Sequence, residues 1–187
     1  MELLAPAGSF EAFIAAINNG ADAVYLGGEL YSARQSAANF GESELKAAIE
    51  YAHLRDKKVY AAVNTLIDNR EFGPALDYLF TLQQIGLDGV IIQDLGLLQA
   101  AHISLPHLRL HASTQMTVHN QDGAVWVRDQ GVKRIVLARE LNSSEIKSIR
   151  DLVTGVELEV FVHGAHCFCY SGQCLFSSLV GGRSGNR

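Results

Sequence analysis

The chain has 187 residues, of which 48% are apolar and 19% are charged. This composition is typical of one globular domain with a sizeable core, and it excludes a disordered chain. The formal charge of −5, with dispersed basic residues, excludes a free-standing nucleic-acid-binding protein. A nucleic acid could be bound only through a specific site or a further part of the protein.

The segment from Met1 to Pro6 has no basic stretch followed by an apolar run, and no later segment approaches the roughly 20 apolar residues of a membrane-spanning helix. We therefore predict a cytoplasmic protein with no membrane partner. All cysteines lie between Cys167 and Cys174, and their number is odd. This distribution indicates metal or redox chemistry rather than a disulfide framework.

Short apolar or β-branched runs recur along the chain at intervals of roughly 20 to 35 residues, as parallel βαβ units require. Each run is predicted to be a strand. The seven predicted strands are Glu2–Ala5, Ala23–Leu26, Val59–Val63, Gly89–Ile92, Leu108–His111, Arg134–Ala138 and Leu158–Val162.

Segments between these runs carry apolar residues at helical spacing and predict amphipathic helices that lie on the sheet. Asn142 followed by Glu145 predicts a capping box for a helix from Ser143 toward Leu152. Pro74 fits the first turn of a helix. The apolar helix faces are Phe10, Phe13, Ile14 and Ile17; Leu45, Ala48, Ile49 and Ala52; and Phe72, Leu76, Leu79 and Phe80.

The strands are almost continuously apolar, which is typical of a parallel sheet covered on both faces. A doubly wound sheet is the main alternative, but the first strand leads into Pro6–Ser9 without a G-x-G-x-x-G motif. The sequence therefore predicts an α/β fold: a single TIM-barrel-like catalytic domain over residues 1–187, incomplete with about seven strands. The open edge is expected to pair in a homodimer or to be covered by the chain's own tail.

Polar residues follow most predicted strands. In a (β/α) barrel, residues at the carboxyl ends of strands line one mouth and carry the chemistry. We expect their side chains to share one cavity; the alternatives are helix caps, loop hydrogen bonds, or a buried ion network of Asp94, Arg139 and Glu140. The candidates are Asn64, Gln93, Asp94, His111, Gln115, Arg139, Glu140 and His163, with Tyr25 and Ser113 nearby.

The segment after the last predicted strand holds Cys167, Cys169 and Cys174 beside His163 and His166. Thiolates are soft ligands suited to zinc or an iron–sulfur cluster. A second interpretation is a cysteine peptidase in which Cys167 is the nucleophile and His163 the base. A third is that the cysteines only pack.

This segment resembles the signature of the collagenase-like peptidase family of unassigned catalytic type. Similar segments occur along the rest of the chain, including Leu4–Gly8, Gly20–Gly27 and His111–Met116. The residues that match the signature are Glu159, Phe161, Gly164, Ala165, Cys167, Gly172, Cys174 and Ser177.

The resemblance implies a barrel domain with a peptide or an RNA substrate, since the family includes peptidases and iron–sulfur proteins that hydroxylate ribosomal RNA, transfer RNA or a quinone precursor. A cluster explains two cysteines at a fixed spacing, and a peptidase does not. We therefore expect a hydroxylase in which Cys167 and Cys174 are iron–sulfur ligands, with Cys169 only a neighbour. Relatives carry further cysteines beyond this segment, so the chain is expected to be truncated. The cluster is expected to be missing or replaced by adventitious metal, and residues 167–187 are expected to be poorly fixed or rearranged.

Overall fold

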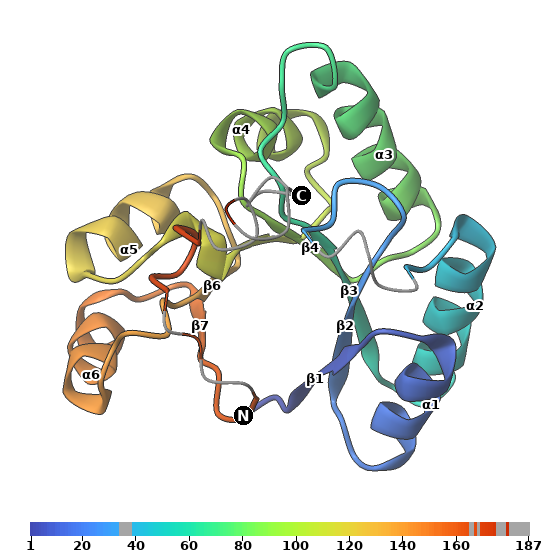
Figure 1. Ribbon diagram of the computed structural model, residues 1–187, viewed down its shortest axis with the longest axis horizontal. Coiled ribbons are helices and arrows are strands. Elements are labelled where there is room, and N and C mark those ends of the chain that lie inside the picture. Colours follow the sequence, from blue (N-terminus) through green and yellow to red (C-terminus); the bar gives the residue numbers. More distant parts are fainter. Residues whose placement is uncertain (34–38, 165–166, 168, 175–178, 180–187) are drawn as a thin grey trace.

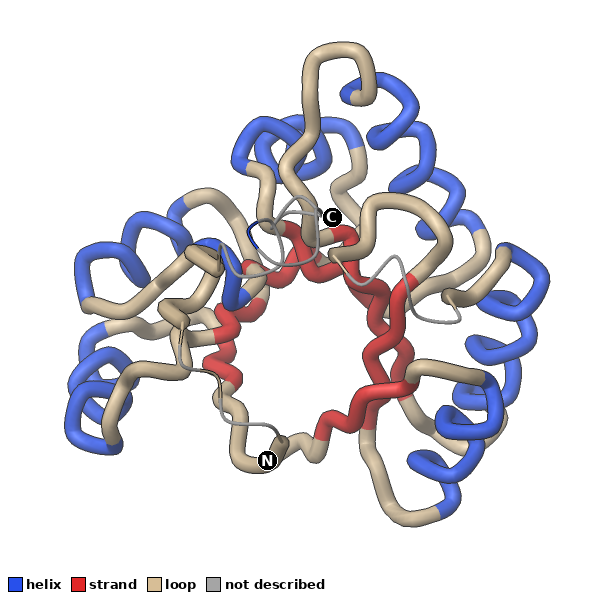
Figure 2. The backbone as a smooth tube through the Cα atoms, viewed as in Figure 1, coloured by secondary structure: helices blue, strands red, loops and turns tan. Residues whose placement is uncertain are grey.

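The computed structural model describes residues 1–33, 39–164, 167, 169–174 and 179. Seven parallel strands form one sheet in the order β1-β2-β3-β4-β5-β6-β7, curved into an open barrel with the helices outside (Figures 1 and 2). None of the described helices is long and apolar enough to cross a membrane. The strands are β1 (Leu4–Ala7), β2 (Ala23–Gly27), β3 (Lys58–Val63), β4 (Gly89–Ile92), β5 (Leu110–Ala112), β6 (Arg134–Val136) and β7 (Glu157–Glu159).

The strand order follows the chain order, so the predicted barrel-like sheet is confirmed and the doubly wound alternative is wrong. The strand bounds differ at both ends of the sheet. The first strand begins at Leu4 rather than Glu2, whose side chain instead turns to Arg134. The last strand ends at Glu159, because its partner β6 is only three residues long and the register ends at Val136.

The helices follow the sequence signals closely. The predicted capping box of the last helix is present, since Asn142 accepts hydrogen bonds from Ser144 and Glu145 while Glu145 accepts from the Asn142 backbone. Pro74 lies in the first turn of its helix, as predicted. The helices are α1 (Phe10–Asn18), α2 (Glu42–His53), α3 (Phe72–Gln84), α4 (Leu95–Ser104), α5 (Gln121–Asp129) and α6 (Ser143–Leu152), with the 3-10 helix η1 (Thr114–Met116).

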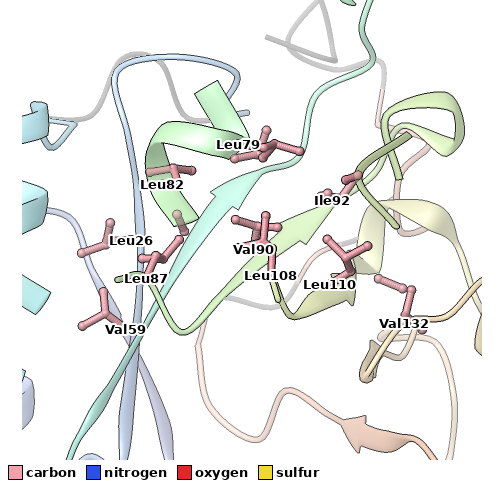
Figure 3. Packing of buried hydrophobic residues seen from close by; sticks show 14 of the residues in the cluster. Leu26, Val59, Leu79, Leu82, Leu87, Val90, Ile92, Leu108, Leu110 and Val132 are labelled. Atoms are coloured by element: carbon pink, nitrogen blue, oxygen red, sulfur yellow. The ribbon is translucent and has the colours of Figure 1, made fainter. Parts of the chain in front are cut away.

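The hydrophobic core lies between the sheet and the surrounding helices. Alternate residues of each strand point outward, so that Val59, Val90 and Ile92 meet Leu79 and Leu82 of α3 (Figure 3). The intervening strand residues point into the barrel, where Ala23, Tyr60 and Ile91 form a separate small cluster. This two-residue period explains why the strands are apolar on both faces.

Charged residues occupy the amino-terminal half of the barrel interior. The guanidinium of Arg134, on β6, is 6% exposed and lies 2.7 Å from Glu2, 2.6 Å from Glu157 and 3.4 Å from Glu159. Tyr60 donates a hydrogen bond of 3.2 Å to Glu2. One buried cation therefore connects the chain before β1 with β6 and β7.

The described strands leave the sheet open between β1 and β7, as predicted, since β1 pairs only with β2 and β7 only with β6. No backbone hydrogen bonds of the described strands bridge this opening, but the ion pair of Glu2 and Arg134 does. Glu2 precedes β1, and Arg134 lies on β6, next to β7. A homodimer through this edge stays a prediction.

Replacing Arg134 by methionine should destabilise the fold by roughly 3 kcal/mol at neutral pH, because it leaves Glu2 and Glu159 without their buried cation. The loss should shrink below about pH 4, where these carboxylates become protonated. Urea unfolding at both pH values measures the effect. The matched control is Arg128→Met, which removes the surface pair with Asp129 and should cost less than about 1 kcal/mol. Equal losses in the two variants would contradict the role of Arg134.

Candidate active site at the carboxyl ends of the strands

The predicted site residues follow four neighbouring parallel strands. Asn64 follows β3, Gln93 follows β4, Gln115 lies in η1 after β5, and Arg139 comes shortly after β6. Because the strands are parallel and pair in chain order, their carboxyl ends lie at the same edge of the sheet (Figure 1). We call this edge with its following loops the rim.

Asn64 holds a loop of the rim. Its Oδ1 accepts a hydrogen bond of 3.1 Å from the backbone of Ala33, in the loop after β2. The next residue, Thr65, is buried and donates to the Tyr31 carbonyl at 3.3 Å. These contacts connect the ends of β2 and β3, so Asn64 has the loop-bonding role that was the alternative to catalysis.

Asp94 is a helix cap. Its carboxylate accepts from the Leu97 backbone at 2.8 Å, which caps α4, and from the Ile67 backbone at 3.2 Å. Both carboxylate oxygens are therefore occupied by backbone donors, as is typical of an N-cap. The ion pairs of the described residues include none between Asp94 and Arg139. Asp94 therefore has the helix-cap role, and it does not take part in the ion network that was the other structural alternative.

The side-chain oxygens of Gln93 and Gln115 have no hydrogen-bond partner among the described residues. Among the described residues, the Oε1 atoms of both side chains are buried and accept no hydrogen bond. A buried polar atom without a partner is unfavourable in a folded protein, and it is a common feature of ligand sites. Gln93 and Gln115 are the two rim residues of the predicted set that have such an atom.

Arg139 and Glu140 are exposed and bind the cysteine segment rather than one another. The Arg139 backbone and Nε each donate to Ser171 Oγ at 3.2 Å. The Ser171 backbone donates to Glu140 Oε1 at 2.6 Å. Although burial raises the pKa of Glu140, the hydrogen bonds that its carboxylate accepts outweigh this effect and lower it. Both residues thus hold Ser171, which is fully buried.

The cysteines lie just before and after Ser171. Cys167 is exposed, whereas Cys169 and Cys174 are half-buried, and no disulfide joins them. A hydrogen bond with the Cys174 thiol, more than any charge, raises the pKa of Cys169. Cys169 is therefore a direct neighbour of Cys174, and the Arg139 guanidinium is close enough to act on it.

Thiolates are soft ligands, so the cysteine side chains are chemically suited to bind a soft metal ion or a cluster. An iron–sulfur cluster is usually held by four cysteine thiolates, and the chain contains three cysteines. Within the described ranges, no three histidine, cysteine, aspartate or glutamate side chains are grouped to hold a metal ion. The described thiols alone therefore do not form a complete cluster site.

His163 is exposed, and the described residues show no hydrogen bond between it and Cys167. His166 lies outside the described residues, as do Ala165 and Ser177 of the signature. The shared cavity predicted for the rim stays untested. A hollow of about 460 Å³ lies at the other end of the barrel, lined by Arg109, Lys133, Gly155, Val156 and Glu157.

His111 does not belong to the rim, so its predicted place there is wrong. The strand covers Leu110–Ala112 rather than ending at His111, so the imidazole points into the barrel and lies 4.7 Å from the Tyr60 ring. Both ring nitrogens are buried without a partner. Burial, followed by the positive charges of Arg134 and Arg109, lowers the pKa of His111 to about 3.

Ser171, Thr114 and Thr117 form the contact between the cysteine segment and the rim, and none of them was predicted as a site residue. Thr117 Oγ1 donates to the Ser171 carbonyl at 2.7 Å, and Thr114 Oγ1 lies 3.4 Å from Ser171 Oγ. One usable signal existed, because Ser171-Gly172 is a turn dipeptide between two cysteines.

The chain forms an open barrel of parallel βα units, and a segment that bears thiols is bound to its rim. These features define the class: a (β/α)-barrel protein with a candidate thiol site. Residues 8–187 match Peptidase family U32, and the chain belongs to that family. The resemblance to collagenase-like peptidases is thereby confirmed. The structure of a U32 peptidase superposes with a TM-score of 0.72 at 22% identity, over 90% of this chain and 70% of that one.

Curated relatives match over the entire chain. A tRNA hydroxylation protein P of Helicobacter pylori is 42% identical, and a 23S rRNA 5-hydroxycytidine synthase of Escherichia coli is 40% identical. An uncharacterized protease of Methanocaldococcus jannaschii is also 40% identical. The chain covers 44%, 28% and 46% of these proteins, respectively, and so spans less than half the length of each.

The interior position of His111 predicts an acid-sensitive fold. Its pKa of about 3 lies below the 6.5 of a free histidine, so the unfolded chain binds a proton between these values and the folded chain does not. Stability should therefore fall with decreasing pH by roughly 1.4 kcal/mol per unit from this residue, while above pH 6.5 the contribution is fully present. His111→Phe should lose this slope in urea unfolding between pH 7 and pH 4.

The exposed His107 supplies the control, and His107→Gln should keep the wild-type slope. Parallel curves for the wild type and His111→Phe would show that the interior imidazole titrates normally, which would contradict its burial without partners.

Proposed function

We propose that this chain is the barrel part of an RNA hydroxylase that acts on transfer or ribosomal RNA in the cytoplasm. The carrying observation is the identity of 36% to 42%, over the whole chain, with tRNA hydroxylation proteins of Helicobacter pylori and Bacillus subtilis and with the Escherichia coli 23S rRNA 5-hydroxycytidine synthase.

The rim supports a nucleobase substrate. The unpartnered amide oxygens of Gln93 and Gln115 can accept hydrogen bonds from the exocyclic amine or ring N–H of a base. RNA bases are read in this way when they are unpaired and splayed out of the chain. The net charge of −5 predicts few contacts between this domain and RNA phosphates. We therefore expect this domain to recognise the base itself and a further part of the protein to bind the RNA backbone.

We also propose that Cys167 and Cys174 are ligands of an iron–sulfur cluster in the complete protein. When bound, such a cluster supplies electron-transfer chemistry at the site. This chain's own residues hold the segment on the rim through Arg139, Glu140 and Ser171. Further ligands are needed, because the described thiols supply only part of a cluster site.

The peptidase alternative rests on the family description and the relative described as a protease. It requires Cys167 and His163 within hydrogen-bonding reach. Both side chains are exposed, and the described residues show no hydrogen bond between them. The geometry therefore favours the hydroxylase.

The test replaces Cys174 by serine in the complete protein and measures hydroxylated nucleosides by mass spectrometry of RNA from cells that lack the native gene. Cys174→Ser should reduce the hydroxylated nucleoside to background and should lower the iron content of anaerobically purified protein, because a serine hydroxyl is a poor ligand for this soft site. Cys169→Ser is the matched control and should retain both.

Wild-type levels of the modification in the Cys174→Ser strain would overturn the cluster assignment. Peptide cleavage by metal-free wild-type protein that is abolished in Cys167→Ser would establish the peptidase alternative instead.

A further inference from the structure

The cysteine turn, which we define as Cys169–Cys174, is closed by a hydrogen bond of 3.0 Å from the Gln173 backbone to the Tyr170 carbonyl. Ser171 and Gly172 are its central residues. Ser171 is fully buried, and its backbone N–H, carbonyl and hydroxyl all have partners on the rim. The turn is therefore bound to the rim at its tip, between the two half-buried thiols.

Position 172 requires glycine, for two reasons. Its φ of 74° is the left-handed value that the third residue of a type II turn requires. A Cβ at this position would overlap the Gln115 carbonyl oxygen and would lie 2.8 Å from Thr117 Oγ1. The turn thus packs its backbone directly on the rim, beside the residue whose amide end has no partner.

Thr117 holds an unfavourable backbone conformation to make this contact. Its φ is 58°, a left-handed value that β-branched residues rarely adopt. A chain that needed only this backbone shape would be better served by glycine or asparagine. The side chain explains the residue, because Thr117 Oγ1 makes the 2.7 Å hydrogen bond to the Ser171 carbonyl. Strain of this kind is retained where it serves a site.

We propose that Thr117, Ser171 and Gly172 are positioning residues that dock the cysteine turn on the rim and so fix Cys169 and Cys174 on either side of the docked residues. The docking orders the thiols before any metal arrives. The link between docking and a cluster rests on the proposed function. The docking itself does not depend on that function. Thr117 therefore acts on thiol chemistry through Ser171, without touching a thiol.

The first test measures the rate at which a disulfide reagent, 5,5′-dithiobis(2-nitrobenzoate), modifies Cys169 and Cys174 in the chain carrying Cys167→Ser. Thr117→Gly relaxes the backbone but removes the hydroxyl, and Thr117→Ser keeps the hydroxyl. Labelling should be about threefold to tenfold faster in Thr117→Gly, as expected for the loss of one hydrogen bond, and unchanged in Thr117→Ser. The melting temperature of Thr117→Gly should not fall, which separates docking from general stability.

Gly172→Ala and Gly155→Ala form a matched pair for the same assay. Both glycines have a positive φ, 74° and 81°, but only the Cβ added at Gly172 meets the rim, whereas that at Gly155 meets open space. Gly172→Ala should speed labelling and Gly155→Ala should not. Equal labelling rates in Gly172→Ala, Thr117→Gly and Gly155→Ala would overturn the docking role.

The second test uses the complete protein, purified anaerobically, with iron content and the electron paramagnetic resonance signal of the reduced cluster as readouts. Gly172→Ala should lose iron or change the signal, and Gly155→Ala should retain both. Faster labelling of Gly172→Ala with an unchanged iron content and signal would support the docking role of Gly172 but overturn the assignment of the turn to a cluster. This outcome separates a failure of the proposed cofactor from a failure of the docking.

Discussion

The buried guanidinium of Arg134 is the constraint on which the barrel depends. The seven described strands do not close into a ring of backbone hydrogen bonds, so the two edges of the sheet must be held in another way. Arg134 provides this link, because it joins Glu2 before β1 to Glu157 and Glu159 on β7. Each carboxylate offsets part of the cost of burying the cation, and the cation in turn permits three acids to lie close together.

This arrangement separates the two ends of the barrel by role. At the amino ends of the strands, charged groups are paired, and the neutral His111 packs against Tyr60. At the carboxyl ends, Asp94 and Asn64 stabilise loops, while the side-chain oxygens of Gln93 and Gln115 have no hydrogen-bond partner among the described residues. Stability is thus concentrated away from the rim, as is usual in (β/α) barrels, and the rim can carry groups whose geometry suits a ligand rather than the fold.

The fold was largely predictable because its signals are local. Apolar runs, helical spacing and the Asn142 cap depend on neighbours in sequence, and the structure has them where they were predicted. The site was less predictable, because it depends on contacts between distant residues. His111 was misplaced since a shift of one or two residues in the end of a strand decides whether a side chain lies inside the barrel or on the rim. The docking of Ser171 on Thr117 joins residues 54 positions apart, and no local pattern encodes it.

The way the cysteine turn is held bears on the choice between the two chemistries. A nucleophilic cysteine needs a base within reach and room to attack a carbonyl. A metal ligand needs a fixed position relative to other ligands. The structure fixes the segment at Ser171 and Gly172, between Cys169 and Cys174, and leaves Cys167 exposed. The buried contacts of the rim therefore fix the turn that ends at Cys174, which suits a ligand role for Cys174, whereas Cys167 has no such base in hydrogen-bonding contact among the described residues.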